Sequence, residues 1–373
     1  MSLERCAEDQ SLYDAAFRLA WGVHGMKVTL DSPVVLRDLQ RISQHLDASR
    51  ELSGKHLLIT GSTGFFGKWL LALIAFLNRE GAGIEVTAVS RTPERFLGDY
   101  PEYRQCGWIT WLQGDVQALP HLSELRPVDM VIHAATDTLA GAHADPLCIF
   151  DTILKGARNI LDLAVTTGAK RVLFTGTGAQ YGVISPSQPV PESHMSSCNS
   201  LLASSAYAEA KRAQETLAAL YADRYGLEII LTRCFAFSGP GLPLNAHFAI
   251  GNFIRDAIGH EALVMQSTGQ AVRSYLHGAD LAVWLLTLLV RGQSGHAYNV
   301  GSDQGLSIAN LARRVVARVA PQTPIIMPDA QGNDSRASYY VPDIEKARAL
   351  GLDVWTSLDE SIDSMVDWVL DRQ

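Results

Sequence analysis

Hydrophobic positions through the first two thirds of the chain alternate between two periods. Short apolar runs of strand length are separated by segments in which apolar residues recur at helical spacing, and 68–80, KWLLALIAFLNRE, is the clearest of these segments. Strands that alternate with helices form parallel βαβ units, which assemble into a doubly wound sheet. The runs expected as strands are 55–60, 84–91, 128–135, 171–176 and 227–235. The pattern therefore predicts an α/β fold built on a parallel sheet.

The two ends of the chain follow different patterns. Segment 31–47 has helical spacing, with Asp31 or Ser32 available as the N-cap. Toward the C-terminus, short mixed elements replace the regular alternation, and 185–205, rich in Ser and Pro, is typical of a long loop beside a site. We expect a helical N-terminal extension (1–50), the sheet domain (51–235) and a smaller mixed C-terminal lobe (236–373) that is partly interleaved with the sheet.

Composition and charge limit the kinds of partner. The chain of 373 residues is 47% hydrophobic and 19% charged, which suits a globular protein with a sizeable core. Its net charge of −8 offers no basic surface for nucleic acid, so an anionic ligand would have to be held by a few placed Arg or Lys side chains. The longest apolar runs, 70–77 and 281–290, are too short to cross a bilayer, so no membrane partner is expected.

The five cysteines argue against a disulfide framework and against a metal site. They are odd in number, widely separated and never in a CxxC pattern, as expected of free thiols in a reducing compartment. The N-terminus has early acidic residues and no basic region followed by an apolar stretch, so it lacks the pattern of a signal peptide. The expected setting is the cytoplasm, and no bound metal is expected.

Three glycines form the first chemical motif, at G-x-x-G-x-x-G spacing between an expected strand and an expected helix. Glycine allows a sharp turn and lets backbone N–H groups approach a pyrophosphate, whose charge then lies at the helix N-terminus. The strand before it, and the helix and second strand after it, make the motif more specific than the glycines alone. It predicts a dinucleotide cofactor, held by Gly61, Thr63, Gly64, Phe65, Phe66 and Gly67.

The end of the second expected strand bears on the choice between NAD and NADP. NAD enzymes commonly place Asp or Glu there for the ribose 2′-hydroxyl, whereas this chain has Ser90 and Arg91, with Arg95 one helical turn later. A guanidinium suits a 2′-phosphate, so NADP is slightly favoured over NAD, although Arg91 would equally serve as the partner of a surface acid. Asp115, followed by Val116, is a candidate acceptor for the adenine amino group or simply a turn residue.

Tyr207 and Lys211 form the second chemical motif. Residues four apart share one face of a helix, which places the lysine ammonium near the phenol. A cationic lysine and an oxidised nicotinamide both favour the phenolate, which lowers the pKa of a tyrosine toward working pH. Thr177, in TGTGAQYG at the end of an expected strand, is placed to hydrogen-bond the same substrate oxygen. The alternatives are a partly buried core tyrosine and a strand-end threonine that bonds backbone.

Several motifs together resemble the extended short-chain dehydrogenase/reductase superfamily and, within it, the nucleotide-sugar epimerase/dehydratase family. They are GSTGFFG (61–67), HAAT (133–136), the set of Thr177, Tyr207 and Lys211, and RCFAFSGPG (233–241). The resemblance implies a Rossmann domain that holds NAD(P) and a small C-terminal lobe that holds a nucleoside-diphosphate sugar. It makes the threonine, tyrosine and lysine the catalytic triad. Because this fold often dimerises through two helices, one of them carrying the tyrosine, a homodimer is expected.

The same resemblance nominates further residues. Ala134 and Ala135 correspond to positions beside the cofactor. In RSYLHGADLA, Arg273 matches the arginine that clamps the substrate diphosphate, and in HFAIGNFI, Asn252 is a weaker candidate for contact with the nucleotide. His277, close to that arginine, is interpreted as a packing histidine rather than a catalyst.

The two residues after Thr177 bear on the reaction. In the family's 4,6-dehydratases the threonine is followed by Asp and Glu, which assist the elimination of water, and sugar-nucleotide decarboxylases tend to keep the Glu. Gly178 and Ala179 stand at these positions here, and neither can give or take a proton. The resemblance therefore suggests hydride transfer at a sugar carbinol or ketone without elimination, by a 4-epimerase or a 4-ketoreductase. It disfavours a 4,6-dehydratase.

Epimerase and reductase both stay open at this point. Arg91 favours a reductase that releases its NADP in each turnover, whereas the abundance of epimerases in the family favours an epimerase that retains its dinucleotide. A non-catalytic NADP-sensing regulator on the same fold is a further alternative. Such regulators usually lack the tyrosine or the lysine, and this chain has both.

Overall fold

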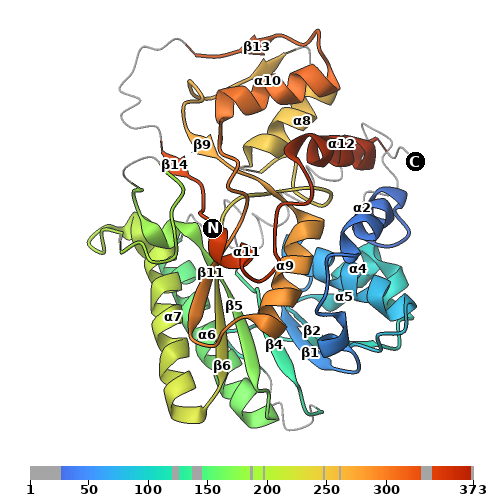
Figure 1. Ribbon diagram of the computed structural model, residues 1–373, viewed down its shortest axis with the longest axis vertical. Coiled ribbons are helices and arrows are strands. Elements are labelled where there is room, and N and C mark those ends of the chain that lie inside the picture. Colours follow the sequence, from blue (N-terminus) through green and yellow to red (C-terminus); the bar gives the residue numbers. More distant parts are fainter. Residues whose placement is uncertain are drawn as a thin grey trace.

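A seven-stranded parallel sheet forms the centre of the molecule (Figure 1). The computed structural model describes residues 27–119, 126–136, 145–184, 188–195, 198–246, 248–259, 262–328 and 338–370. In spatial order the strands are β11 (His296–Val300), β6 (Glu228–Cys234), β5 (Arg171–Thr177), β4 (Met130–His133), β1 (His56–Thr60), β2 (Glu85–Ser90) and β3 (Ile109–Gln113). Strand order reverses between β1 and β4, where a doubly wound sheet places its ligand crevice. The predicted Rossmann-type α/β fold is confirmed.

The hydrophobic pattern did not predict two of these strands. β3, with sequence ITWLQ, and β11, with sequence HAYNV, mix polar with apolar residues, and they form the two edges of the sheet. An edge strand has a neighbour on one side only, so its sequence needs no continuous apolar run. β11 comes from the C-terminal part of the chain, which returns to the sheet beside β6.

The helices cover both faces of the sheet. α6 (Pro146–Thr167) and α7 (Ala206–Tyr225) pack against each other, and their core includes Leu58 of β1. On the other face, α4 (Phe65–Arg79) packs against α9 (Gly278–Arg291), in a core that includes Leu57 and Ile59. Successive residues of one strand thus serve opposite layers. None of the described helices is both long and apolar enough to cross a membrane.

A smaller lobe of helices and short strands lies at the top of Figure 1. Its helices are α8 (Ala249–Gly259), α10 (Ile308–Val319) and α12 (Leu358–Val369). Its strands are β7 (Phe237–Ser238), β8 (Leu263–Val264), β9 (Val272–Arg273), β10 (Leu276–His277), β12 (Leu306–Ser307), β13 (Ile325–Ile326) and β14 (Tyr339–Tyr340). Shorter helical elements are α3 (Ser49–Leu52), α5 (Pro93–Asp99), η1 (Pro101–Arg104), η3 (Gly178–Tyr181), η4 (Ala203–Ser205) and α11 (Glu345–Arg348).

The N-terminal segment is packed into the molecule through α2 (Pro33–Ser43). Ser32 caps this helix, since its Oγ accepts a hydrogen bond from the Val35 N–H at 3.5 Å. The apolar face of α2 contacts α9 and α12, so the segment joins the sheet layers to the small lobe. Residues 1–26 of the expected extension, and 185–187 and 196–197 of the expected loop, lie outside the described residues. The domain boundaries at 51–235 and 236–373 stay a prediction.

Candidate active site

The glycine turn after β1 is shaped by contacts that exclude side chains. Gly61 has a φ of 70°, and a Cβ there would lie 2.6 Å from the carbonyl oxygen of Ala134. At Gly67 a Cβ would lie 2.3 Å from the Cα of Ser62, so the first turn of α4 packs directly on the loop. Gly64 caps this helix without a side-chain hydrogen bond, and no acidic residue lies in its first turn. The N-terminus of α4 therefore fits a dinucleotide pyrophosphate.

The other residues expected in this turn lie on both sides of it. Thr63 is half-buried in the loop, and Phe65 and Phe66 begin α4. Phe66 packs edge-on against Phe237 of β7, with ring centroids 4.9 Å apart. The glycine turn thus packs, through Phe66, against the segment that leads into the small lobe.

A cavity of about 350 Å³ lies beside the glycine turn, between Thr63, the start of α5 and the loop 241–245. Lys68, Arg95 and Arg255 line it, together with one acidic side chain, Asp99. Arg95 makes no hydrogen bond or ion pair with any other residue that the structure describes. Cationic groups beside the predicted pyrophosphate site suit a further phosphate.

The carboxyl ends of β1 and β4 are tied together at the reversal of strand order. The Thr60 hydroxyl accepts a hydrogen bond from the Ala135 N–H at 3.2 Å and lies 2.8 Å from Nδ1 of His133. The Ala134 N–H donates to the Thr60 carbonyl at 3.3 Å. Burial, with Lys211 nearby, lowers the pKa of His133 to about 3, so this imidazole is neutral. Ala134 and Ala135 therefore lie at the crevice without a charged neighbour on β4.

The ends of β2 and β3 hold the remaining residues nominated for the cofactor. Ser90 is buried, and its hydroxyl accepts from the Thr92 N–H at 3.3 Å, while Arg91 is exposed. Asp115 accepts from the Gln117 N–H at 2.8 Å, which makes it a turn residue whatever else it binds. Val116 is buried against α6, whose Gly156 allows the close approach, since a Cβ there would lie 3.0 Å from the valine Cγ2.

Lys211 is fully buried at the end of the crevice. Its Nζ donates to the Thr175 carbonyl at 2.7 Å, to the Thr136 hydroxyl at 2.9 Å and to Gln214 at 3.3 Å, so all three donors are engaged. Burial lowers the pKa of this amine to about 8. The ammonium is therefore held in one position at neutral pH.

Tyr207 is half-buried on the first turn of α7, next to Ile149 and Ile153 of α6. Burial, and then the neighbouring Tyr340, raise the pKa of its phenol above the ordinary value, while a hydrogen bond from Thr177 lowers it. Lys211 is not among the groups that act on this pKa. In the protein by itself the ammonium is turned toward β4 and β5, and the expected effect of the lysine together with a bound nicotinamide stays a prediction.

Thr177, at the end of β5, brings two phenols together. Its hydroxyl accepts a hydrogen bond from the Ala179 N–H at 3.2 Å and lies 3.3 Å from the hydroxyl of Tyr340. Its third contact is with Tyr207. The structure thus brings Thr177 and Tyr207 together and adds Tyr340, which no motif indicated, while the roles of Thr177 and Tyr207 stay a prediction.

Gly178 has no room for an acidic side chain. A Cβ at this position would lie 2.8 Å from the ring of Phe235 and 2.9 Å from the hydroxyl of Tyr340. These two side chains fill the space beside Thr177 in which a carboxylate would have to lie. The packing around Gly178 therefore excludes an acid at this position, in addition to the sequence having none there.

Of the two residues nominated for the substrate, one lies near this group. Arg273 on β9 donates to the Ser338 carbonyl at 2.9 Å, and its guanidinium lies 5.5 Å from the ring centroid of Tyr340. Asn252 on α8 donates to the Ala246 carbonyl at 2.8 Å and accepts from Arg255 at 3.3 Å. No contact joins Asn252 to Thr177, Tyr207 or Lys211 among the described residues.

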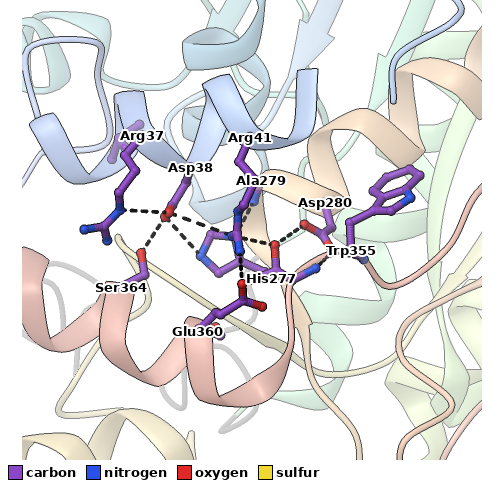
Figure 2. Close-up of polar contacts among 12 residues, drawn as sticks. Arg37, Asp38, Arg41, His277, Ala279, Asp280, Trp355, Glu360 and Ser364 are labelled. Carbon is purple, nitrogen blue, oxygen red and sulfur yellow. Dashed lines mark hydrogen bonds and ion pairs between the residues drawn. The ribbon is translucent and has the colours of Figure 1, made fainter. Parts of the chain in front are cut away.

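His277 has a structural role, as interpreted from the sequence. It is fully buried, its Nδ1 accepts from the Ala279 N–H at 3.1 Å, and its Nε2 lies 3.4 Å from Asp38 of α2 (Figure 2). Asp38 also accepts from the Ser364 hydroxyl of α12. Burial lowers the pKa of His277. The residue joins three elements and, within the described part of the chain, has no contact with Thr177, Tyr207 or Lys211.

Comparisons with known proteins agree with this geometry. The model of the NAD dependent epimerase/dehydratase family matches residues 57–301. UDP-glucuronic acid decarboxylases 5 and 3 of Arabidopsis thaliana are 30% and 32% identical to the chain, over 84% and 83% of its length and 89% and 87% of theirs.

Solved structures share the fold. UDP-glucose 4-epimerase of Thermotoga maritima, solved with UDP-glucose, has a TM-score of 0.71 at 20% identity, covering 84% of this chain and 98% of its own. A dTDP-glucose 4,6-dehydratase of Streptomyces venezuelae, solved with NAD, has a TM-score of 0.70 at 24% identity, covering 84% and 96%. The fold accommodates more than one reaction, so the reaction must be argued from the site.

Proposed function

This chain belongs to the NAD-dependent epimerase/dehydratase family, and from that membership we propose that it transfers hydride at a carbinol or ketone carbon of a nucleoside-diphosphate sugar. The observation that carries the proposal is the group of Thr177, Tyr207 and Lys211 beside the glycine turn, with the adjacent acid position closed by Phe235 and Tyr340. A 4-epimerase and a 4-ketoreductase both fit, and a 4,6-dehydratase fits less well.

The proposed roles follow from the contacts of each side chain. Tyr207 takes the proton of the sugar hydroxyl, or returns it, from its place on the first turn of α7. Thr177 hydrogen-bonds the same oxygen and the phenol. Lys211, held by three acceptors, supplies a fixed positive charge at the crevice. A bound dinucleotide accepts or supplies the hydride.

The absence of an acid after Thr177 favours a reaction without elimination. Loss of water from a 4-keto sugar needs one group that removes a proton and one that protonates the leaving hydroxyl, and Gly178 and Ala179 offer neither. The similarity to UDP-glucuronic acid decarboxylases supports a UDP-sugar as substrate. Release of carbon dioxide from UDP-glucuronic acid would assign decarboxylation instead.

NADP as the cofactor is the finer part of the proposal. Ser90 and Arg91 end β2 without a carboxylate, and the cavity beside Thr63 is lined by Lys68 and Arg95. With Arg255, which also lines this cavity, a 2′-phosphate there would meet three cationic side chains. NADP is only slightly favoured over NAD, since the solved structure of the Streptomyces venezuelae dehydratase contains NAD.

A homodimer is proposed through α6 and α7. Both helices carry exposed apolar side chains, with Leu147 72% and Leu220 62% exposed. Such side chains suit an interface between copies of the chain. Light scattering should return twice the monomer mass of 40.6 kDa, and a monomer at micromolar concentration would count against it.

The experiment that tests the proposed function is the Tyr207→Phe variant. Phenylalanine keeps the ring packed on Ile153 but cannot exchange the proton, so we expect turnover to fall by roughly a hundredfold or more while dinucleotide binding is unchanged. Turnover is measured by product analysis with UDP-sugars, and binding by fluorescence titration. Turnover equal to that of the parent would reject the enzymatic assignment and favour a dinucleotide sensor.

A further inference from the structure

The hydroxyl of Tyr340 lies against the catalytic threonine, although 163 residues separate the two in sequence. β14 carries it there by pairing in parallel with β9, which sets Tyr340 beside Arg273. Its ring packs on Phe235 of the chain after β6, with centroids 4.6 Å apart, and under the Arg273 guanidinium at 5.5 Å. The ring is therefore packed against two side chains, which restricts the direction of its hydroxyl.

The contact with Tyr340 determines which hydrogen bonds the Thr177 hydroxyl can still make. A hydroxyl has one hydrogen to donate and two lone pairs to accept with. The Ala179 N–H donates to Oγ1 at 3.2 Å, and the Tyr340 hydroxyl lies 3.3 Å away. When Tyr340 donates as well, both lone pairs are engaged, and the hydrogen of Thr177 is left for Tyr207.

The Tyr340 phenol is suited to be the donor. Burial raises its pKa to about 12, so it keeps its proton throughout the neutral range. Its alternative acceptor is the Cys234 carbonyl, also at 3.3 Å. The Thr177 hydroxyl and the Cys234 carbonyl are thus two acceptors at equal distances from one phenol hydrogen.

We propose that Tyr340 is a positioning residue of the reaction: its hydroxyl donates to Thr177 and so turns the threonine's own hydrogen toward the Tyr207 oxygen. The inference rests on the proposed function. Tyr340 acts only through Thr177 and need not touch the sugar. A side chain at Gly178 would meet the Tyr340 hydroxyl, so this arrangement occupies the position at which the family's 4,6-dehydratases are expected to carry an acid.

The charged and titratable groups around the two phenols have separable effects. Cys234 is buried, which raises its pKa to about 11, so the thiol is neutral. Arg273 lies over the Tyr340 ring and remains charged. Lys211, with a pKa of about 8, bonds Thr175 and Thr136 and not Tyr340, so its titration should be unaltered by a change at Tyr340.

The test is the pH profile of kcat/KM for Tyr340→Phe in the direction of sugar oxidation. The variant keeps the ring packed against Phe235 and Arg273 but cannot donate a hydrogen bond to Thr177. The hydrogen of Thr177 is then no longer directed to the Tyr207 phenolate. We expect the acidic limb of the profile to move up by about one pH unit, which lowers activity on that limb about tenfold, with dinucleotide affinity unchanged.

Two controls separate positioning from packing. Tyr339→Phe removes a hydroxyl from the adjacent residue of β14 and should leave the profile in place. In a Thr177→Val background, Tyr340→Phe should cause no further shift, because its effect passes through the threonine. An unshifted profile for Tyr340→Phe, or an equal shift in Tyr339→Phe, overturns the inference.

The outcome is distinguishable from failure of the proposed function. If Tyr207→Phe remains active, the function itself is wrong. If Tyr207→Phe is inactive while Tyr340→Phe keeps the parental profile, the function stands and only the role of Tyr340 is rejected. If Tyr340→Phe alters stability alone, its hydroxyl serves the Cys234 carbonyl.

Discussion

At the scale of single residues, the proposed reaction without elimination depends on a glycine. Gly178 is the position where the sequence suggested a reaction without elimination, and the packing of Phe235 and Tyr340 gives a physical reason for the missing side chain. The nominated triad could be read from short motifs. Tyr340 could not, because it adjoins Thr177 only through the pairing of β14 with β9.

Gly178→Asp should therefore fail to restore an acid. The new Cβ would lie 2.8 Å from Phe235, so we expect a loss of about 1–3 kcal/mol in the free energy of unfolding and a marked loss of activity. Urea denaturation measures the first. The control is Gly107→Asp, since a Cβ at this exposed glycine has nothing within 4 Å. Unchanged stability in Gly178→Asp would mean that the neighbours move aside easily.

The preference for NADP over NAD is tested by a substitution at Arg95. Arg95→Gln removes a cation from the cavity beside Thr63, so affinity for NADPH should fall about tenfold while affinity for NADH changes little. Fluorescence titration with both dinucleotides measures this. A parallel Arg104→Gln variant, which breaks an exposed pair with Glu94, should alter neither. Equal losses for NADPH and NADH in Arg95→Gln would contradict the assigned phosphate position.

At the scale of elements, the sequence predicted the parts with continuous apolar runs and missed those without them. Buried strands such as β1 and β5 were predicted from their runs, and Ser32 was named as one possible cap of α2. β3 and β11 were missed because edge strands tolerate polar residues. The buried polar contacts of α2 had no local signal either, since Asp38, His277 and Ser364 come from three elements (Figure 2).

Asp38 should be essential to the docking of α2. Asp38→Ala removes the partner of the buried His277 and Ser364, so we expect a loss of about 2–4 kcal/mol in the free energy of unfolding. Chemical denaturation measures it, with activity assayed well below the midpoint. Asp367→Ala, which breaks a more exposed pair with Arg37, should cost less than about 1 kcal/mol. Equal losses in both variants would remove any special role for the buried pair.

At the scale of the whole molecule, a net charge of −8 leaves ligand binding to a few placed cations. The glycine turn follows β1 and Lys211 bonds the Thr175 carbonyl of β5, so both lie near the reversal of strand order, while Arg273 of the small lobe lies over the Tyr340 ring. The fold class followed from alternating strands and helices and from recognised motifs. The interleaved return of α9 and β11 to the sheet depends on long-range packing, which no local pattern encodes.

Isotope tracing follows the hydride that we propose to be transferred at a sugar carbon without elimination. The protein is incubated with a dinucleotide and a UDP-sugar deuterated at C4, and the products are analysed by mass spectrometry. We expect an isomer, or an alcohol–ketone pair, with deuterium found only on the sugar carbon or in the reduced dinucleotide. A product that has lost water or carbon dioxide would reject hydride transfer without elimination.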